Sequence, residues 1–112
     1  MNPKLYVLTR ADLSPGAQAT QSVHAAFQFA LEYPELTKDW YKDSQVLVLL
    51  SVPDEESLMG WVLNLQDEGL FHSVFHEPDW EDQLTAVAVA PSETAQRIFA
   101  SLPLTLREAS LV

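Results

Sequence analysis

The sequence predicts an α/β fold: a single three-layer α/β/α domain with a four-stranded mixed sheet. Short apolar runs alternate with stretches whose apolar residues recur every three or four positions, which is typical of strands and amphipathic helices in turn. The continuous apolar run Val46–Leu50 is expected to be covered on both faces, which requires helices on both sides of the sheet. The gap Glu77–Gln83 is too short for a helix, so the strands around it should be antiparallel.

Length and composition indicate one domain over residues 1–112. A chain of 112 residues that is 47% hydrophobic can bury one core, and no second domain fits. The absence of cysteine excludes disulfides, cysteine-ligated metals and thiol chemistry. The apolar run at the N-terminus is too short for a signal peptide, and no run reaches the roughly 18 apolar residues of a membrane span. We therefore expect a cytoplasmic protein without a membrane partner.

The first strand is predicted over Lys4–Arg10, in the centre of the sheet, and a helix should follow it. Ser14 is a good N-cap, and Pro15 at the first helical position loses only an amide that has no partner. The helix should run to about Leu31. Its apolar stripe, expected to pack on the sheet, comprises Ala19, Val23, Ala26, Phe27 and Ala30.

The opposite face of this helix is polar. Gln21, His24 and Gln28 stand one turn apart on it, beside the small residues Ala17 and Ala25. The side chains offer hydrogen-bond donors and acceptors on a surface that another molecule can approach closely. The alternative is an ordinary solvated helix face.

The middle of the chain predicts two more helices. A short one over Glu35–Lys42 should point Leu36 and Trp40 inward. The second begins at the N-cap Asp54 and ends near Gly69, which suits a left-handed cap. Its buried stripe is expected to comprise Leu58, Trp61, Val62 and Leu65.

The last third of the chain predicts two strands and a helix. The strands are expected over His72–His76 and Leu84–Ala90, and the helix should begin at Ser92 and extend to Leu102. His72 and His76 are unsuited to hold one metal ion, because strand residues four apart lie about 13 Å from each other. No glycine-rich phosphate loop and no G-x-S-x-G motif is present. Neither a metal nor a cofactor is therefore implied.

The charge argues against strong binding to nucleic acid. The 16 acidic and 6 basic residues give a net charge of −10, and phosphate binding depends on lysine and arginine. Lys38 and Lys42, together with Arg10, are expected to form at most a small positive area. The plain interpretation of the acidic excess is solubility.

Two separated motifs nevertheless resemble those of the type II peptidyl-tRNA hydrolases. The first is the order Arg10, Asp12-Leu13, Gly16, Gln21 and His24-Ala25-Ala26. The second is Glu77-Pro78-Asp79 followed by Thr85 and, before the last helix, Ala90-Pro91. Ala17 departs from the pattern, because it stands where the family has a lysine. A positive charge near a phosphate or a developing oxyanion is therefore missing.

The resemblance implies cleavage of the ester between a peptide and the terminal ribose of its tRNA. By position in the motifs, Asp79 is expected to orient or activate water. The loop is shorter than the family's usual one, so Glu77 is the alternative acid if Asp79 is displaced. Gln21 and Thr85 are expected to contact the ester or ribose, and His24 to orient the network or share the role of base. Arg10 and Asp12 would brace the cleft, and Gln28 would extend the substrate-binding face.

Three functions therefore remain open at this point. The first is peptidyl-tRNA hydrolysis, weak and salt-sensitive because few basic residues are available. The second is a non-catalytic relative that serves as a binding or dimerisation module, which Ala17 and the acidic charge favour. The third is hydrolysis of a smaller acyl ester or amide. We also expect a homodimer.

Overall fold

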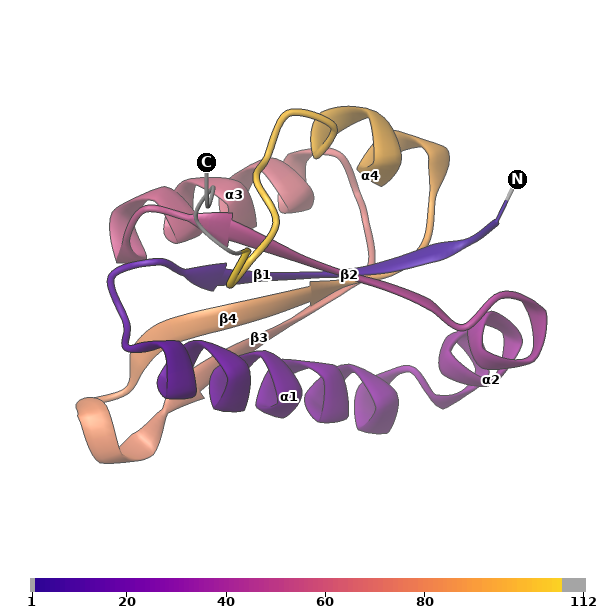
Figure 1. Ribbon diagram of the computed structural model, residues 1–112. Coiled ribbons are helices and arrows are strands. Elements are labelled where there is room, and N and C mark those ends of the chain that lie inside the picture. The colour runs from indigo at the N-terminus through magenta and orange to yellow at the C-terminus, as the bar shows by residue number, and fades with distance from the viewer. Residues whose placement is uncertain (1, 108–112) are drawn as a thin grey trace.

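The computed structural model describes residues 2–107, and Figure 1 shows its helices on both sides of a twisted sheet. Its elements are, in chain order, β1 (Lys4–Arg10), α1 (Pro15–Glu32), α2 (Pro34–Asp43), β2 (Val46–Val52), α3 (Glu55–Asp67), β3 (His72–Glu77), the 3-10 turn Pro78–Trp80, β4 (Gln83–Val89) and α4 (Glu93–Ile98).

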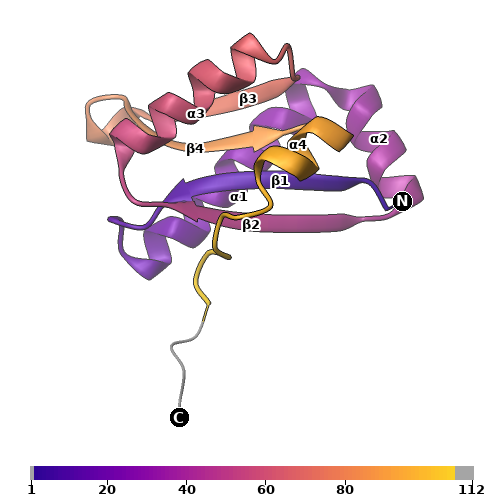
Figure 2. The same ribbon diagram turned by 90° about the horizontal axis from the view of Figure 1, so that it is seen from above.

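The sheet has four strands in the order β2-β1-β4-β3, seen from above in Figure 2. β1 pairs with β2 in parallel, while β4 lies antiparallel to both β1 and β3. The predicted mixed sheet is therefore confirmed, with β1 inside it. The short connection between β3 and β4 forms an antiparallel hairpin, as the length of the gap predicted.

The helices cover the two faces in pairs, so the predicted three-layer arrangement is also confirmed. α1 and α2 lie on one face of the sheet, and α3 and α4 on the other (Figure 1). The molecule has two apolar cores, one on each face of the sheet, and alternate residues of β1 point into them. Leu5 and Val7 pack with Phe29 of α1, whereas Tyr6 and Leu8 pack on the α3 side. Each layer is thus held to the sheet by its own apolar cluster.

The face of α1 that packs on the sheet is not the predicted one. The buried residues are Gln18, Gln21, Ser22, Ala25 and Phe29, whereas Ala19, Val23 and Phe27 of the expected stripe are exposed and Ala26 and Ala30 are partly buried. The helix is rotated so that the small Ala25 meets the small Ala86 and Ala88 of β4, and polar side chains beside it find partners on the sheet. Spacing alone does not distinguish these faces.

β2 is not the doubly covered strand that its apolar run predicted. It lies at an edge of the sheet, and Leu47 is 48% exposed on the α1 side. The segment after α4 covers part of the outer edge: Ser51 donates its N–H to the carbonyl of Pro103, and Thr105 donates to that of Leu49. We call residues 103–105 the edge strap.

The remaining helices follow the prediction more closely. Asp54 caps α3 by accepting the N–H of Ser57, and Gly69 follows it with a φ of 67°. Leu58, Val62 and Leu65 are buried, and Trp61 is partly buried. α2 turns Leu36 and Trp40 inward. α4 begins after Ser92 but ends at Ile98, shorter than predicted, because the chain turns there toward β2.

The expected positive area does not form. The Ser44 hydroxyl, just after α2, donates to the carbonyl of Pro3, which places α2 beside the start of β1. Arg10 ends the same strand, about 20 Å away at the usual rise per residue. Lys38 and Lys42 of α2 therefore lie at the opposite end of the sheet from Arg10 (Figure 1).

Candidate active site

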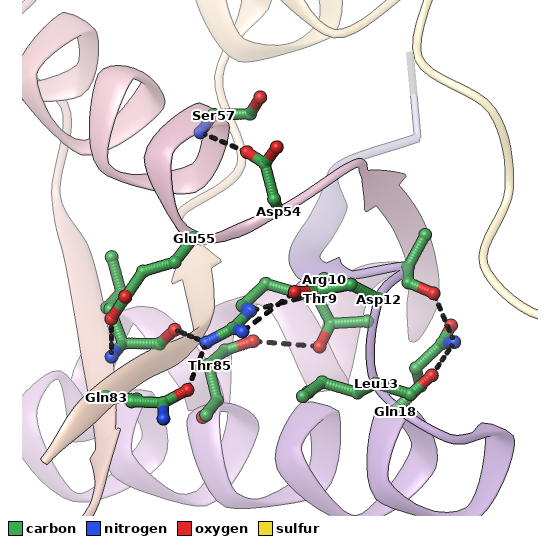
Figure 3. Close-up of polar contacts among 12 residues, drawn as sticks. Thr9, Arg10, Asp12, Leu13, Gln18, Asp54, Glu55, Ser57, Gln83 and Thr85 are labelled. Atoms are coloured by element: carbon green, nitrogen blue, oxygen red, sulfur yellow. Dashed lines mark hydrogen bonds and ion pairs between the residues drawn. The ribbon is translucent and has the colours of Figure 1, made fainter. Parts of the chain in front are cut away.

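The carboxyl end of β1 is braced by Arg10, whose side chain is buried between the sheet and the following turn. Its guanidinium makes a bidentate ion pair with Asp12, with both N···O distances 2.9 Å. It also donates to the side chain of Gln83 and to the carbonyl of Leu84, at 2.9 and 3.1 Å (Figure 3). The hydrogen bond from Arg10 lowers the pKa of the Asp12 carboxyl. The guanidinium thus ties β1 to β4.

The turn into α1 is held by Gln18. Its side-chain amide donates to the carbonyls of Leu13 and Ala11, at 2.7 and 3.3 Å (Figure 3). Ser14 caps the helix by accepting the N–H of Ala17. The first turn of α1 is therefore fixed relative to the sheet, and this positions the polar residues that follow it in the helix.

Gln21 and Thr85 join α1 to β4 beneath the surface. The Thr85 hydroxyl donates to the side-chain oxygen of Gln21 at 2.6 Å. Because a hydroxyl donor requires an acceptor, this bond places the oxygen of the Gln21 amide toward β4. The amide nitrogen therefore points away from β4. Thr85 and Gln21 are 0% and 2% exposed, so neither side chain lies on the surface that the sequence analysis expected.

The amide nitrogen of Gln21 donates to the carboxylate of Glu77, the last residue of β3, at 3.0 Å. The other carboxylate oxygen accepts the N–H of Asp79 at 3.3 Å and caps the 3-10 turn. The hydrogen bond from Gln21 lowers the pKa of Glu77, aided by that N–H and by the charge of His24. Unlike Gln21, Glu77 is only partly buried.

His24 lies one turn after Gln21 and packs edge-on against Phe75 of β3. Their ring centroids are 4.6 Å apart and the ring planes are at 87°. Glu77 follows Phe75 by two residues on the same strand, so both contact the same side of α1. The structure therefore brings His24 and Glu77 together at the surface above the buried Gln21.

Asp79 and Gln28 lie outside this network. Asp79 belongs to the exposed 3-10 turn and contributes its backbone N–H, not its carboxylate, to the contact with Glu77. Gln28 donates to Glu32 further along α1, at 2.7 Å. Of the predicted site residues, Gln21, Glu77 and Thr85 are directly connected, Arg10 and Asp12 form a separate brace, and Asp79 borders the network.

Acidic residues gather at this end of the molecule. The turn after β1, the turn between β3 and β4 and the start of α3 meet there (Figure 1). Together they carry Asp12, Asp54, Glu55, Glu56, Glu77, Asp79, Glu81 and Asp82. Arg10 is committed to Asp12, and Glu55 accepts the N–H of Leu84 at 2.8 Å. The surroundings of the network are therefore negative.

Two surface hollows lie away from the network. One of about 340 Å³ lies between α3 and β3 and is lined by residues that include Met59, His72 and His76. The other, of about 320 Å³, is almost wholly apolar and lies between α1, α2 and the start of β2. Among residues 2–107, no three histidine, aspartate or glutamate side chains are grouped to hold a metal ion.

Sequence reasoning missed three residues that support the site. Gln18 holds the turn into α1, and Gln83 accepts a hydrogen bond from Arg10. Glu55, at the start of α3, accepts the N–H of Leu84 near the start of β4. The position of Gln18, four residues after the N-cap, is a usable signal, because its side chain can reach back to the turn. Gln83 and Glu55 depend on contacts between distant segments, and nothing in their neighbours predicts them.

The comparisons with known proteins point to one family. The family model described as peptidyl-tRNA hydrolase PTH2 matches residues 3–105. No curated protein matches the chain. A similar solved structure is that of a protein of unknown function from Agrobacterium tumefaciens strain C58, with a TM-score of 0.69 and 12% identity over 93% of this chain and 98% of that one. At this identity the likeness shows the fold alone. No helix within residues 2–107 is long and apolar enough to cross a membrane.

Proposed function

Since this chain belongs to the peptidyl-tRNA hydrolase PTH2 family, we propose that it hydrolyses the ester between a peptidyl or N-blocked aminoacyl group and tRNA. The observation that carries the proposal is the buried chain of hydrogen bonds from Thr85 through Gln21 to Glu77. Such a chain restricts the carboxylate to one orientation beside His24.

In this proposal Glu77 takes the role that the sequence analysis gave to Asp79. The Glu77 carboxylate is held by Gln21 and lies near His24, whereas Asp79 is exposed and contributes only its backbone N–H to the contact with Glu77. Gln21 and Thr85 are positioning residues, because their side chains are too deeply buried to touch a substrate. Glu77 and His24 are the groups that meet it.

The reaction requires one water molecule and two proton movements. Water oxygen attacks the ester carbonyl carbon and loses a proton, and the bond to the ribose oxygen then breaks as that oxygen receives a proton. The products are a carboxylic acid, which ionises, and the free ribose hydroxyl. Glu77 orients the water as a hydrogen-bond acceptor. His24 takes and returns the proton, because a ring nitrogen of neutral imidazole accepts a proton that the imidazolium can then donate.

The test compares two matched substitutions of neighbouring carboxylates. Glu77→Gln and Asp79→Asn each remove one negative charge while keeping a similar shape. On N-blocked aminoacyl-tRNA, Glu77→Gln should lower kcat by about 100-fold, the usual scale for loss of an acid–base or water-orienting group. Asp79→Asn should stay within about threefold of wild type. The reverse order would show that Asp79 carries the chemistry.

A non-catalytic binding module is the second candidate, and the acidic surroundings of the network favour it. Ala17 leaves that end without a free cation near the first turn of α1. Ala17→Lys would place an ammonium group one turn before Gln21. If the enzyme proposal holds, this variant should raise turnover about tenfold, the value of one charge-assisted contact formed in the transition state. No turnover by wild type or Ala17→Lys would favour the binding module.

Hydrolysis of a smaller acyl ester is distinguished by the leaving group. The same N-blocked aminoacyl ester can be offered on tRNA and on a short alcohol. If turnover is confined to the small ester, the family resemblance holds for the chemistry but not for the substrate. The Glu77→Gln variant then tells whether the same network performs it.

A further inference from the structure

The side chain of His24 is held differently from the carboxylate near it. Glu77 accepts a hydrogen bond from the amide of Gln21. Within the described part of the chain, neither ring nitrogen of His24 makes a hydrogen bond, whereas Nδ1 of His72 contacts the carbonyl oxygen of Leu70 at 2.8 Å. A histidine that moves protons is commonly oriented by a hydrogen bond to its second nitrogen. The orientation of His24 therefore depends on packing.

The packing partner of His24 is the ring of Phe75 on β3. The two ring centroids are 4.6 Å apart and the ring planes are nearly perpendicular, at 87°. This is the edge-to-face arrangement that aromatic rings prefer, because the positive rim of one ring meets the negative face of the other. Both side chains are half-buried, so Phe75 covers part of the imidazole and the rest is open to solvent. Phe75 therefore restricts the rotation of the imidazole without occupying its nitrogens.

The position of Phe75 is itself fixed. Its side chain packs against the core on the α1 side of the sheet, and it lies opposite Ala86 in the pairing of β3 with β4. The Thr85 hydroxyl, which donates to Gln21 at 2.6 Å, also lies 3.3 Å from the carbonyl oxygen of Phe75. Thr85 thus contacts both the residue that holds Glu77 and the residue that packs on His24.

An irregularity in the pairing of β3 with β4 brings Thr85 into this position. Phe75 pairs with Ala86 and the next residue of β3 pairs with Leu84, so Thr85 is an extra residue without a partner in β3. Neighbouring residues of a regular strand face opposite sides, yet Ala86 and Thr85 both face α1. Bulges of this kind are common beside active sites, where they redirect a side chain. The bulge therefore gathers the contacts that position Phe75 and Gln21.

We propose that Phe75 is the positioning residue of His24, and that its ring holds the imidazole toward the Glu77 carboxylate. It takes the place of the hydrogen-bonded group that usually orients a catalytic histidine. The inference rests on the proposed function, because it assigns a task within that reaction. Since no described residue bonds to a ring nitrogen, the imidazole can take up or release a proton at either one. Loss of the Phe75 ring should therefore slow proton transfer and leave substrate binding unchanged.

The kinetic test uses N-blocked aminoacyl-tRNA. Phe75→Leu removes the ring and should lower kcat about tenfold, with KM within about twofold, because a misplaced proton-transfer group slows the chemical step. Phe75→Tyr keeps the ring and should stay within about threefold of the wild-type kcat. In a His24→Asn background, Phe75→Leu should cause no further loss. A further loss of about tenfold there would overturn the inference, because Phe75 would then act independently of His24.

Phe71→Leu is the matched control. Phe71 lies just before β3, at the end of the strand away from Glu77, and its ring packs on Tyr33 with centroids 5.5 Å apart. The substitution removes an aromatic contact of the same kind and should leave kcat unchanged. Circular dichroism checks that each variant is folded. An equal loss of kcat in Phe71→Leu would overturn the inference, because the effect of Phe75→Leu would then be general destabilisation.

A second measurement does not require turnover. Nuclear magnetic resonance reports the rotamer of the His24 side chain through three-bond couplings and through contacts between its ring protons and those of residue 75. Wild type and Phe75→Tyr should show one rotamer, and Phe75→Leu several that interconvert. An inactive wild type with this pattern would overturn the proposed function and support the orientation of His24 by Phe75. A His24 ring that keeps one rotamer in Phe75→Leu would overturn the inference, even in an active protein.

Discussion

Glu77 is the residue at which three parts of the chain meet. It ends β3, accepts from Gln21 of α1 and caps the turn that leads to β4. The strand alternation of Ser73, Phe75 and Glu77 toward α1 was readable from the sequence and favours Glu77 over Asp79. The hydrogen bond from Gln21 was not readable, because it depends on the rotation of α1. The choice between the two carboxylates of this loop is therefore a proposal from geometry, not from position in the motif.

Thr85 should matter for both folding and activity, because its hydroxyl is the donor that fixes Gln21. Thr85→Val leaves the Gln21 oxygen buried without that donor, which should cost about 1–3 kcal/mol of unfolding free energy. Loosening of Glu77 should also lower kcat about tenfold. Thr9→Val is the control, since the buried Thr9 hydroxyl donates only to the carbonyl of Thr85. It should lose stability in denaturant titrations and keep its kcat.

Asp12 should contribute to the fall of the unfolding free energy at acidic pH. Arg10 holds the pKa of Asp12 below that of the unfolded chain, about 3.9. The resulting stabilisation is complete above that value and is lost as the pH falls through the folded pKa. The difference in unfolding free energy between wild type and Asp12→Asn should therefore shrink between about pH 5 and pH 2. Asp67→Asn on α3 serves as a control; an equal change there would contradict the assignment.

At the scale of elements, the sequence predicted which segments are helices and strands and which face α3 buries, but not the buried face of α1 or the exposure of β2. The caps Ser14, Asp54 and Ser92 were all readable, because their effect is local. The buried face of α1 was not, since it depends on the small residues that β4 offers on that side. The run in β2 indicated burial on both faces, but strand order placed it at an edge.

The close packing of α1 on β4 allows a mutational test of which face of α1 is buried. Ala25 is fully buried against the alanines of β4. Ala25→Leu adds volume where the backbones approach closely and should cost about 1–3 kcal/mol. Ala19→Leu on the exposed face of the same helix should change stability by less than about 0.5 kcal/mol. Denaturant midpoints measure both. Equal effects would show that the two faces are not as different as the structure has them.

At the scale of the whole molecule, charge is distributed unevenly about a fold whose class and mixed sheet the sequence predicted. The end of the sheet that holds Glu77 is negative, and the exposed cations Lys38 and Lys42 lie at the other end. Net charge was readable from composition. Its placement was not, because Arg10 was expected near those lysines and is instead buried against Asp12.

This distribution fixes the sign of the salt dependence. A protein that neutralises many phosphates loses affinity for nucleic acid as salt rises. Here the site repels phosphate, so salt should screen the repulsion and raise kcat/KM on N-blocked aminoacyl-tRNA, by about threefold between 0.02 and 0.2 M. A neutral ester substrate should show almost no change. A steep fall with salt would mean that a cationic surface contacts the tRNA.

The edge strap has a consequence for how the protein behaves at high concentration. β2 reads VLVLLSV, a sequence with strong β propensity and no charge, and an uncovered edge of such a strand is a template for fibril growth. Residues 103–105 pair with part of that edge, at Leu49–Ser51. A chain cut after Leu102 should therefore form thioflavin-positive aggregates on storage, whereas a chain cut after Arg107 should remain clear. We therefore expect residues 103–105 to limit the growth of aggregates from this edge.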